Sequence, residues 1–101
     1  MKKITVLLSS LLVSSLLVAK TSTANETFSI YLVRHAEKQA TPKRDPLLTE
    51  CGIKRANQIA AMLKEVEIEQ VLSTDYKRTQ LTAKPTAFAK NLKVKSYDPR
   101  A

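Results

Sequence analysis

The sequence predicts an α/β fold, a three-layer α/β/α arrangement around a mainly parallel sheet. Two short apolar runs, residues 28–33 and 68–73, are typical of buried strands, and residues 93–97 alternate charged and apolar side chains as an edge strand does. Residues 49–66 and 76–92 have the spacing of helices with one apolar face. Because strands that alternate with helices usually form parallel sheets, we expect about three strands and two helices.

The first predicted helix, residues 49–66, is the clearest element. Thr49 is suited to be its N-cap, because a threonine hydroxyl can accept a hydrogen bond from a backbone N–H of the first turn. Gly52 lowers helix stability in that turn, which indicates that another segment packs closely against its backbone. The apolar residues at helical spacing, which we expect to form the packed face, are Ile53, Ala56, Ile59, Ala60 and Leu63.

The second predicted helix, residues 76–92, follows Asp75, which is suited to be its N-cap. Pro85 has no backbone N–H to donate, so we expect it to kink this helix or to divide it in two. The apolar stripe of the helix consists of Leu81, Phe88 and Leu92.

The first 24 residues have the layout of a secretory signal peptide. Basic residues at the start precede an apolar run, Ile4–Ala19, and small residues lie around Ala24. The apolar run is 16 residues long, shorter than the roughly 20 needed to span a bilayer. We therefore expect cleavage after Ala24, export to the periplasm or beyond the cell, and no stable membrane insertion afterwards. Residues 25–101 would then form the folded domain.

Cleavage after Ala24 would leave 14 basic and 9 acidic residues, a net charge of +5. A mild basic excess suits an anionic ligand. The basic residues are scattered and aromatic residues are few, so we do not expect nucleic-acid binding.

Cys51 is the only cysteine, which excludes an intrachain disulfide, and we expect it to be buried. The chain also has a single histidine, so it cannot assemble a structural zinc site.

Three side chains suited to phosphate chemistry follow the predicted strands. Arg34 and His35 come directly after residues 28–33, and Arg78 comes soon after residues 68–73. Because the carboxyl ends of parallel strands share one edge of a sheet, we expect the three side chains to meet there. Guanidinium groups offer forked donors to phosphate oxygens, and a neutral imidazole nitrogen is a nucleophile. The amides that open the second helix would add further anion donors.

Each of these residues has an ordinary alternative role. A histidine after a strand is often a surface residue, Arg34 could end a strand in water, and Arg78 could lie on a solvated helix face beside Lys77. The hypothesis therefore depends on the three residues together.

Three sequence blocks resemble the histidine phosphatase superfamily, the phosphoglycerate-mutase-like group. Leu32-Val33-Arg34-His35-Ala36-Glu37 is similar to the family's strand followed by Arg-His-Gly-Glu, with Ala36 in place of the usual glycine. Leu48-Thr49 with Gly52 and Ala56 resembles its Leu-Thr-x-x-Gly-x-x-x-Ala helix start. Leu72-Ser73-Thr74-Asp75-Tyr76-Lys77-Arg78, followed by Thr82-Ala83 and Pro85, is similar to its second block. The blocks occur in the family's order and cover nearly all of residues 25–101.

The resemblance implies a phosphomonoester hydrolase that works through a phosphohistidine intermediate, without a metal or other cofactor. It implies that His35 accepts the phosphoryl group and that Arg34 and Arg78 bind the phosphate. The expected partner is a phosphorylated small molecule or a phosphoprotein. The signal peptide favours a scavenging or envelope phosphatase over a cytoplasmic mutase.

The chain also departs from the family pattern. The family's pocket has a second histidine, which this chain lacks, and the acid that protonates the leaving group has only Glu37 and Asp75 as candidates. We therefore expect the N-terminal portion of such a domain, poorly stable and with little or no turnover. Two other functions remain open, a non-catalytic phosphate-binding remnant and a basic interaction module. The loop at residues 39–45, with Lys43 and Arg44, either selects an anionic substrate or is simply solvated.

Overall fold

The computed structural model describes residues 26–101, so the predicted signal peptide, residues 1–24, lies outside the described residues. The chain divides into two units, Met1–Tyr31 and Leu32–Ala101, and the second holds every helix and strand that the structure describes. Its elements are, in chain order, α2 (Glu50–Met62), β1 (Val71–Ser73), α3 (Lys77–Ala89) and β2 (Val94–Ser96). No helix within residues 26–101 is long and apolar enough to cross a membrane.

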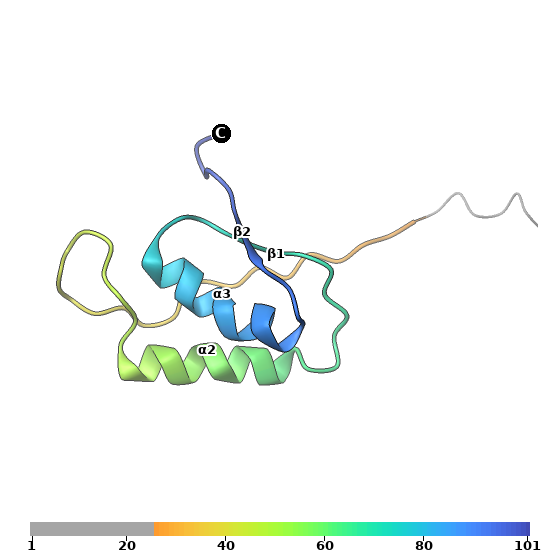
Figure 1. Ribbon diagram of the computed structural model, residues 1–101, viewed down its shortest axis with the longest axis horizontal. Helices are drawn as coiled ribbons and strands as arrows, with labels where there is room; N and C mark the ends of the chain where they lie inside the picture. Colours follow the sequence, from red (N-terminus) through yellow and green to blue (C-terminus); the bar gives the residue numbers. More distant parts are fainter. Residues whose placement is uncertain (1–25) are drawn as a thin grey trace, which may run out of the picture. The chain divides into compact units, whose positions relative to one another are not determined.

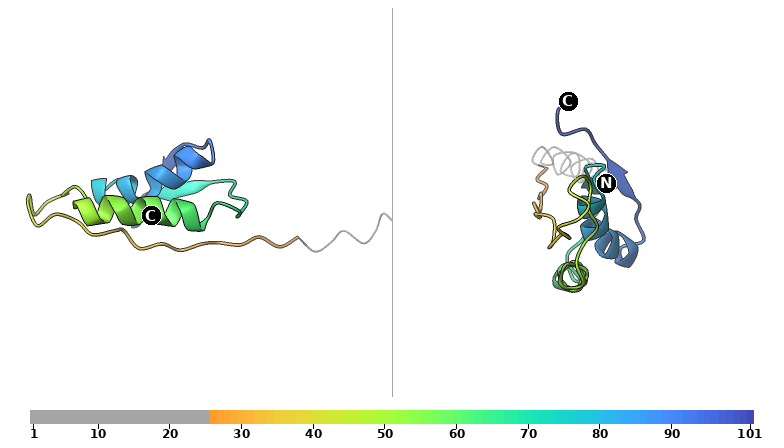
Figure 2. Two further views of the ribbon diagram at one scale, coloured as in Figure 1. Left: turned by 90° about the horizontal axis from the view of Figure 1, so that it is seen from below. Right: turned by 90° about the vertical axis from the view of Figure 1, so that its left-hand side faces the viewer.

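The strands β1 and β2 form a parallel pair joined by α3. Val71 is opposite Val94 and Ser73 is opposite Ser96, and the N–H of Tyr97 extends the pairing by donating to the Ser73 carbonyl at 3.0 Å. Helix α3 contacts both strands on one side and α2 on the other (Figures 1 and 2). A parallel strand pair needs such a crossover connection. The α/β fold class and the parallel sheet are therefore confirmed.

The predicted strand at residues 28–33 is not formed. The structure assigns no strand there, and the side chains of Phe28, Ile30 and Leu32 are exposed, Leu32 to 92%. A strand requires a neighbour for its backbone groups, and among the described residues β1 pairs with β2 alone. The sheet of the described part therefore has two strands, and the prediction of a third was wrong.

Helix α2 begins as its sequence predicts. Thr49 is the N-cap, and its Oγ1 accepts a hydrogen bond from the N–H of Gly52 at 3.0 Å. A methyl group at Gly52 would overlap the carbonyl oxygen of Glu37, so the expected close backbone packing is confirmed. The predicted apolar face is only partly buried, because Ala56 is fully buried whereas Ile53 is 52% exposed.

Helix α3 differs from its prediction at its N-cap and in its buried face. Its N-cap is Tyr76, which makes no capping hydrogen bond through its side chain, so Asp75 does not cap the helix. The helix is a single element that includes Pro85, so the proline does not divide it in two. Its buried residues are Thr82, Thr86 and Ala87, whereas Phe88 of the predicted apolar stripe is 86% exposed. The fully buried residues of α3 are thus small, which suits the close approach of α2 and the strands.

The core of the second unit is small. Ala36, Leu48 and Ala56 are buried in one cluster, and Leu81 of α3 packs against it. Cys51 is exposed, so the expectation of a buried cysteine was wrong. Cys51 lies in the first turn of α2, next to Gly52, and it is Gly52 that faces the Glu37 backbone.

Candidate functional site

His35 lies in the irregular segment that precedes α2, directly before the buried Ala36, and its side chain is half-buried. Its Nδ1 is 2.8 Å from the carbonyl oxygen of the next residue, Ala36. A carbonyl oxygen can only accept, so Nδ1 must carry the proton in this hydrogen bond. In the neutral ring the lone pair is then on Nε2, which is the nitrogen available to attack an electrophile. The sequence alone could not identify this partner, because it is a backbone atom.

The backbone beside His35 is connected to helix α3 through Thr82. The N–H of Ala36 donates to Thr82 Oγ1 at 2.9 Å, and Thr82 Oγ1 donates to the carbonyl oxygen of Arg78 at 2.6 Å. Ala36 and Thr82 are 2% and 5% exposed, so the hydrogen bond between them is shielded from water. The turn of α3 that carries Arg78 is therefore held next to the segment that carries His35, although the two are far apart in sequence.

Arg78 is half-buried near the start of α3. Its guanidinium carbon lies 4.3 Å from the centre of the Tyr76 ring, which is within cation–π distance. Its Nε is buried and has no acceptor among residues 26–101. A guanidinium group presents forked donors that match phosphate oxygens, and no carboxylate within residues 26–101 forms an ion pair with Arg78.

The amides that open α3 are less available than the sequence indicates. The N–H of Lys77 donates to Asp45 Oδ1 at 2.7 Å. The N–H groups of Thr79 and Gln80 donate to the Tyr76 carbonyl. These three N–H groups already have acceptors, so they are less free to bind an anion than expected. The role of Asp45 could not be predicted from local sequence patterns, because the residue comes from the loop before α2.

Arg34 is exposed. Within residues 26–101 no hydrogen bond or ion pair orients its guanidinium toward His35 or Arg78. The structure thus connects His35 and Arg78 through Thr82, and the role of Arg34 stays a prediction.

Comparison with known proteins identifies the family of the chain. A model of the histidine phosphatase superfamily (branch 1) matches residues 30–99. The chain belongs to this superfamily. The matched region includes Arg34, His35, Arg78 and Thr82, and the resemblance of the three sequence blocks is confirmed at the level of the family.

The chain matches individual histidine phosphatase relatives over only part of their length. The chain is 40% identical over 75 residues to phosphoserine phosphatase 1 of Hydrogenobacter thermophilus, which covers 68% of this chain and 36% of that protein. It is 38% identical over 77 residues to the probable phosphoglycerate mutase GpmB of Yersinia pestis and of Yersinia pseudotuberculosis, which covers 70% of this chain and 35% of each relative. The chain spans about a third of the length of these curated relatives.

Glu37, one of the two acid candidates in this histidine phosphatase chain, is tied to Arg55. Two guanidinium nitrogens of Arg55 donate to its carboxylate at 2.8 Å each. The side-chain hydrogen bonds from Arg55 lower the pKa of Glu37 from its ordinary 4.5 to about 2. A carboxylate that stays ionised at neutral pH has no proton to donate to a leaving group. Glu37 is therefore unsuited to be the acid in this structure.

Asp75, the other acid candidate, accepts a hydrogen bond from the Ser96 hydroxyl at 2.8 Å. This contact connects the end of β1 with the end of β2. No three histidine, cysteine, aspartate or glutamate side chains within residues 26–101 gather closely enough to hold a metal ion.

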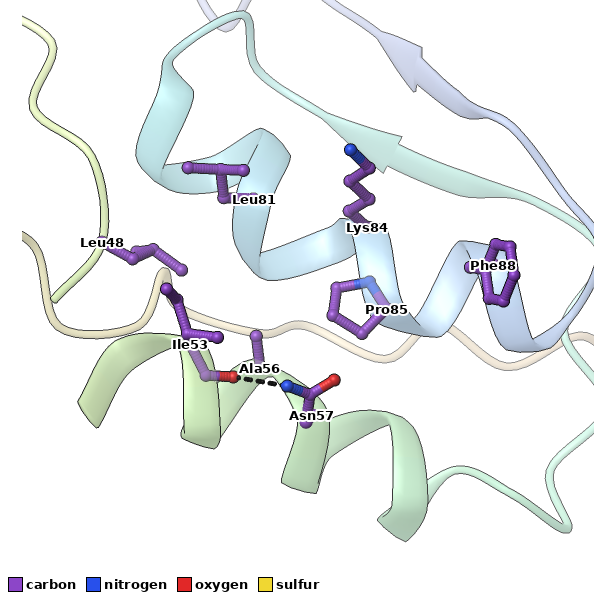
Figure 3. Close-up of a pocket in the computed structure, with 8 residues that line it drawn as sticks. All are labelled: Leu48, Ile53, Ala56, Asn57, Leu81, Lys84, Pro85 and Phe88. Atoms are coloured by element: carbon purple, nitrogen blue, oxygen red, sulfur yellow. Dashed lines mark hydrogen bonds between the residues drawn. The ribbon is translucent and has the colours of Figure 1, made fainter. Parts of the chain in front are cut away.

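A separate groove lies between α2 and α3 (Figure 3). It has a volume of about 350 Å³ and is mostly apolar. Its only charged side chain is Lys84, which points away from α2 in Figure 3. Its lining residues are Leu48, Ile53, Ala56, Asn57, Leu81, Lys84, Pro85 and Phe88. Neither His35 nor Arg78 lines it, so the groove is distinct from the predicted phosphate site.

Proposed function

We propose that this chain carries the phosphoryl-accepting half of a phosphomonoester hydrolase and that His35 forms a phosphohistidine intermediate. The observation that supports the proposal is the hydrogen-bonded path from the Ala36 N–H through Thr82 Oγ1 to the Arg78 carbonyl, which holds the segments of His35 and Arg78 next to each other. Membership of the chain in the histidine phosphatase superfamily supports the same proposal.

The proposed reaction has two steps. The Nε2 lone pair of His35 attacks phosphorus, the P–O ester bond breaks, and the alcohol leaves with a proton taken up from the medium or a neighbouring acid. Water then attacks phosphorus, the P–N bond breaks, and inorganic phosphate and neutral His35 are released. Arg78, with Arg34 as the second predicted cation, would stabilise the charge on the transferring oxygens.

The proposed substrate is a phosphorylated small molecule, with a phosphoprotein as the alternative. Two of the relatives are named a phosphoserine phosphatase and a probable phosphoglycerate mutase, which supports small phosphomonoesters. In this chain, Lys43 and Arg44 are exposed in the loop that precedes Asp45, and they are suited to meet an anionic substituent of the substrate.

A second function has its own support. The chain contains a single histidine, and Glu37 is held in its ionised form by Arg55. Without a further proton donor, transfer to His35 would be slow, and the site would act as a non-catalytic phosphate-binding remnant. We propose little or no steady-state turnover by the 101-residue chain itself.

We also propose that the protein is exported, to the periplasm or beyond the cell, after removal of residues 1–24. The support is the sequence pattern of that segment. N-terminal sequencing of the protein recovered from the periplasmic fraction of an expressing bacterium tests this. A mature chain that begins at Asn25 is expected, and an intact Met1 in the cytoplasmic fraction would contradict it.

Trapping of a labelled phosphoryl group tests the proposed chemistry. The chain is mixed with radiolabelled phosphoserine, quenched in alkali, and analysed for protein-bound label. We expect acid-labile label on the wild-type chain and none on His35→Asn. Phosphate binding without label would favour the non-catalytic alternative, and neither binding nor label would refute both.

A further inference from the structure

Thr82 is the side chain that joins the two halves of the site. Its hydroxyl has one proton, and that proton is used in the 2.6 Å hydrogen bond to the Arg78 carbonyl. A lone pair of the same oxygen therefore faces the N–H of Ala36 at 2.9 Å. The hydroxyl can therefore make both hydrogen bonds at once, as donor to Arg78 and as acceptor from Ala36, and the Thr82 side chain is buried.

The backbone of Ala36 makes two hydrogen bonds, one through its N–H and one through its carbonyl oxygen. Its N–H is held by Thr82, and its carbonyl oxygen accepts from Nδ1 of His35 at 2.8 Å. A carbonyl that holds Nδ1–H sets the tautomer and the orientation of the ring. The position of this carbonyl depends in turn on where the Ala36 backbone is held.

We propose that Thr82 is a positioning residue for phosphoryl transfer: it holds the Ala36 backbone so that His35 keeps Nδ1 protonated and presents Nε2 beside Arg78. This inference rests on the proposed function and extends it. Thr82 does not touch the phosphoryl group and acts through Ala36 and through the Arg78 turn of α3.

Thr86 offers a matched control for this inference. It lies one turn further along α3, it is 7% exposed, and its Oγ1 is buried without a hydrogen-bond partner among residues 26–101. Thr82→Val and Thr86→Val remove the same atom at the same depth in the same helix. Only the first variant breaks the path to His35.

The first readout is the tautomer of the ring. The chain has one histidine, so its imidazole nitrogen chemical shifts are assigned without ambiguity. We expect protonated Nδ1 in the wild-type chain, in Thr82→Ser and in Thr86→Val, and a shift toward the Nε2-protonated form in Thr82→Val. A Thr82→Val ring with the same tautomer as Thr86→Val would overturn the proposal.

The second readout is the rate at which labelled phosphoryl reaches His35. We expect a decrease of about a hundredfold for Thr82→Val, which is the scale of effect that a misplaced reacting group produces, and recovery in Thr82→Ser. An unchanged rate in Thr82→Val would overturn the proposal. If the wild-type chain takes no label, the proposed function fails, whereas the tautomer comparison still decides the role of Thr82.

If Thr82→Val does not fold, hydrogen exchange of the Ala36 amide in the wild-type chain tests the proposal instead. The proposal requires the Ala36 amide to be protected from hydrogen exchange as strongly as the amides in the middle of α3. Exchange of this amide at the rate of an open loop would overturn the proposal without any variant.

Discussion

Arg55 of α2 and Glu37 of the preceding segment form a forked ion pair, with Nε and Nη2 of the guanidinium each 2.8 Å from a different carboxylate oxygen. The same residue, Glu37, also accepts a hydrogen bond from the backbone N–H of Thr49 at its carbonyl oxygen. Glu37 therefore attaches the segment after His35 to the start of α2 through both its side chain and its backbone.

The ion pair predicts how stability depends on pH. Because the pKa of Glu37 is about 2 in the folded chain and near 4.5 when the hydrogen bonds are lost, its contribution is fully present above about pH 4.5. The contribution disappears as the pH falls through the folded pKa near 2. We expect Arg55→Met to raise the pKa of Glu37 toward 4.5, measured by NMR titration of its carboxyl group. Arg100→Met, which removes the guanidinium beside Asp98, should leave Glu37 unchanged; an equal effect of both variants would contradict the assignment.

Gly52→Ala is predicted to destabilise the fold, although alanine is the better helix former. In an open helix this change would be worth up to about 1 kcal/mol of added stability. Here the new methyl group would overlap the Glu37 carbonyl oxygen, and we expect a loss of about 1–3 kcal/mol in the free energy of unfolding. Urea denaturation measures the change. Lys54→Ala, at an exposed position of the same helix, should stay within about 0.5 kcal/mol, and a stabilised Gly52→Ala would show that the close contact is absent.

Asp45 is predicted to stabilise the N-terminus of α3 from outside the helix. Its carboxylate accepts from the Lys77 N–H and also lies where the helix dipole favours negative charge. Its backbone has φ 55°, so an alanine there would add strain of its own. Asp45→Gly removes the carboxylate without that strain, and we expect a loss of about 1 kcal/mol by urea denaturation. Asp45→Asn keeps an acceptor and should lose less. Equal stability of the glycine variant and the wild-type chain would argue against this capping contact.

Arg78 is predicted to carry most of the phosphate affinity that α3 contributes. Arg78→Met and the neighbouring Lys77→Met remove the same charge, but Lys77 is exposed whereas Arg78 is half-buried on the turn that Thr82 connects to the His35 segment. We expect inorganic phosphate to bind at least about tenfold more weakly to Arg78→Met, because a hydrogen bond to a charged group is worth about 1.5–3 kcal/mol. Lys77→Met should have little effect in the same calorimetric titration. Equal losses in the two variants would indicate a general charge effect and no defined site.

Local sequence patterns correctly predicted the elements that depend on interactions between residues close together in the sequence. Thr49 caps α2 through its own hydroxyl three residues from Gly52, and β1 and β2 fall within the apolar and alternating runs at 68–73 and 93–97. The apolar run at 28–33 also has strand character, but a strand depends on a neighbour that hydrogen-bonds to it, and no sequence pattern supplies that information.

The misassigned residues were those whose role depends on distant contacts. Asp75 has the chemistry of an N-cap, yet it accepts from Ser96, and Asp45 binds the helix start in its place. Glu37 looked like an acid, yet a guanidinium from α2 keeps it ionised. Thr82 was visible as part of a family block, but its bond to Ala36 joins residues 46 positions apart and appears only once α3 is packed.

The position of phosphoryl attachment on the His35 ring tests the central claim most directly. The wild-type chain, labelled with nitrogen isotope in its single histidine, is phosphorylated and examined by NMR for coupling between phosphorus and each ring nitrogen. Because the Ala36 carbonyl holds Nδ1–H, the account predicts phosphorus on Nε2 and none on Nδ1. Phosphorus bound to Nδ1, or no phosphorus on the ring while inorganic phosphate still binds, would contradict it.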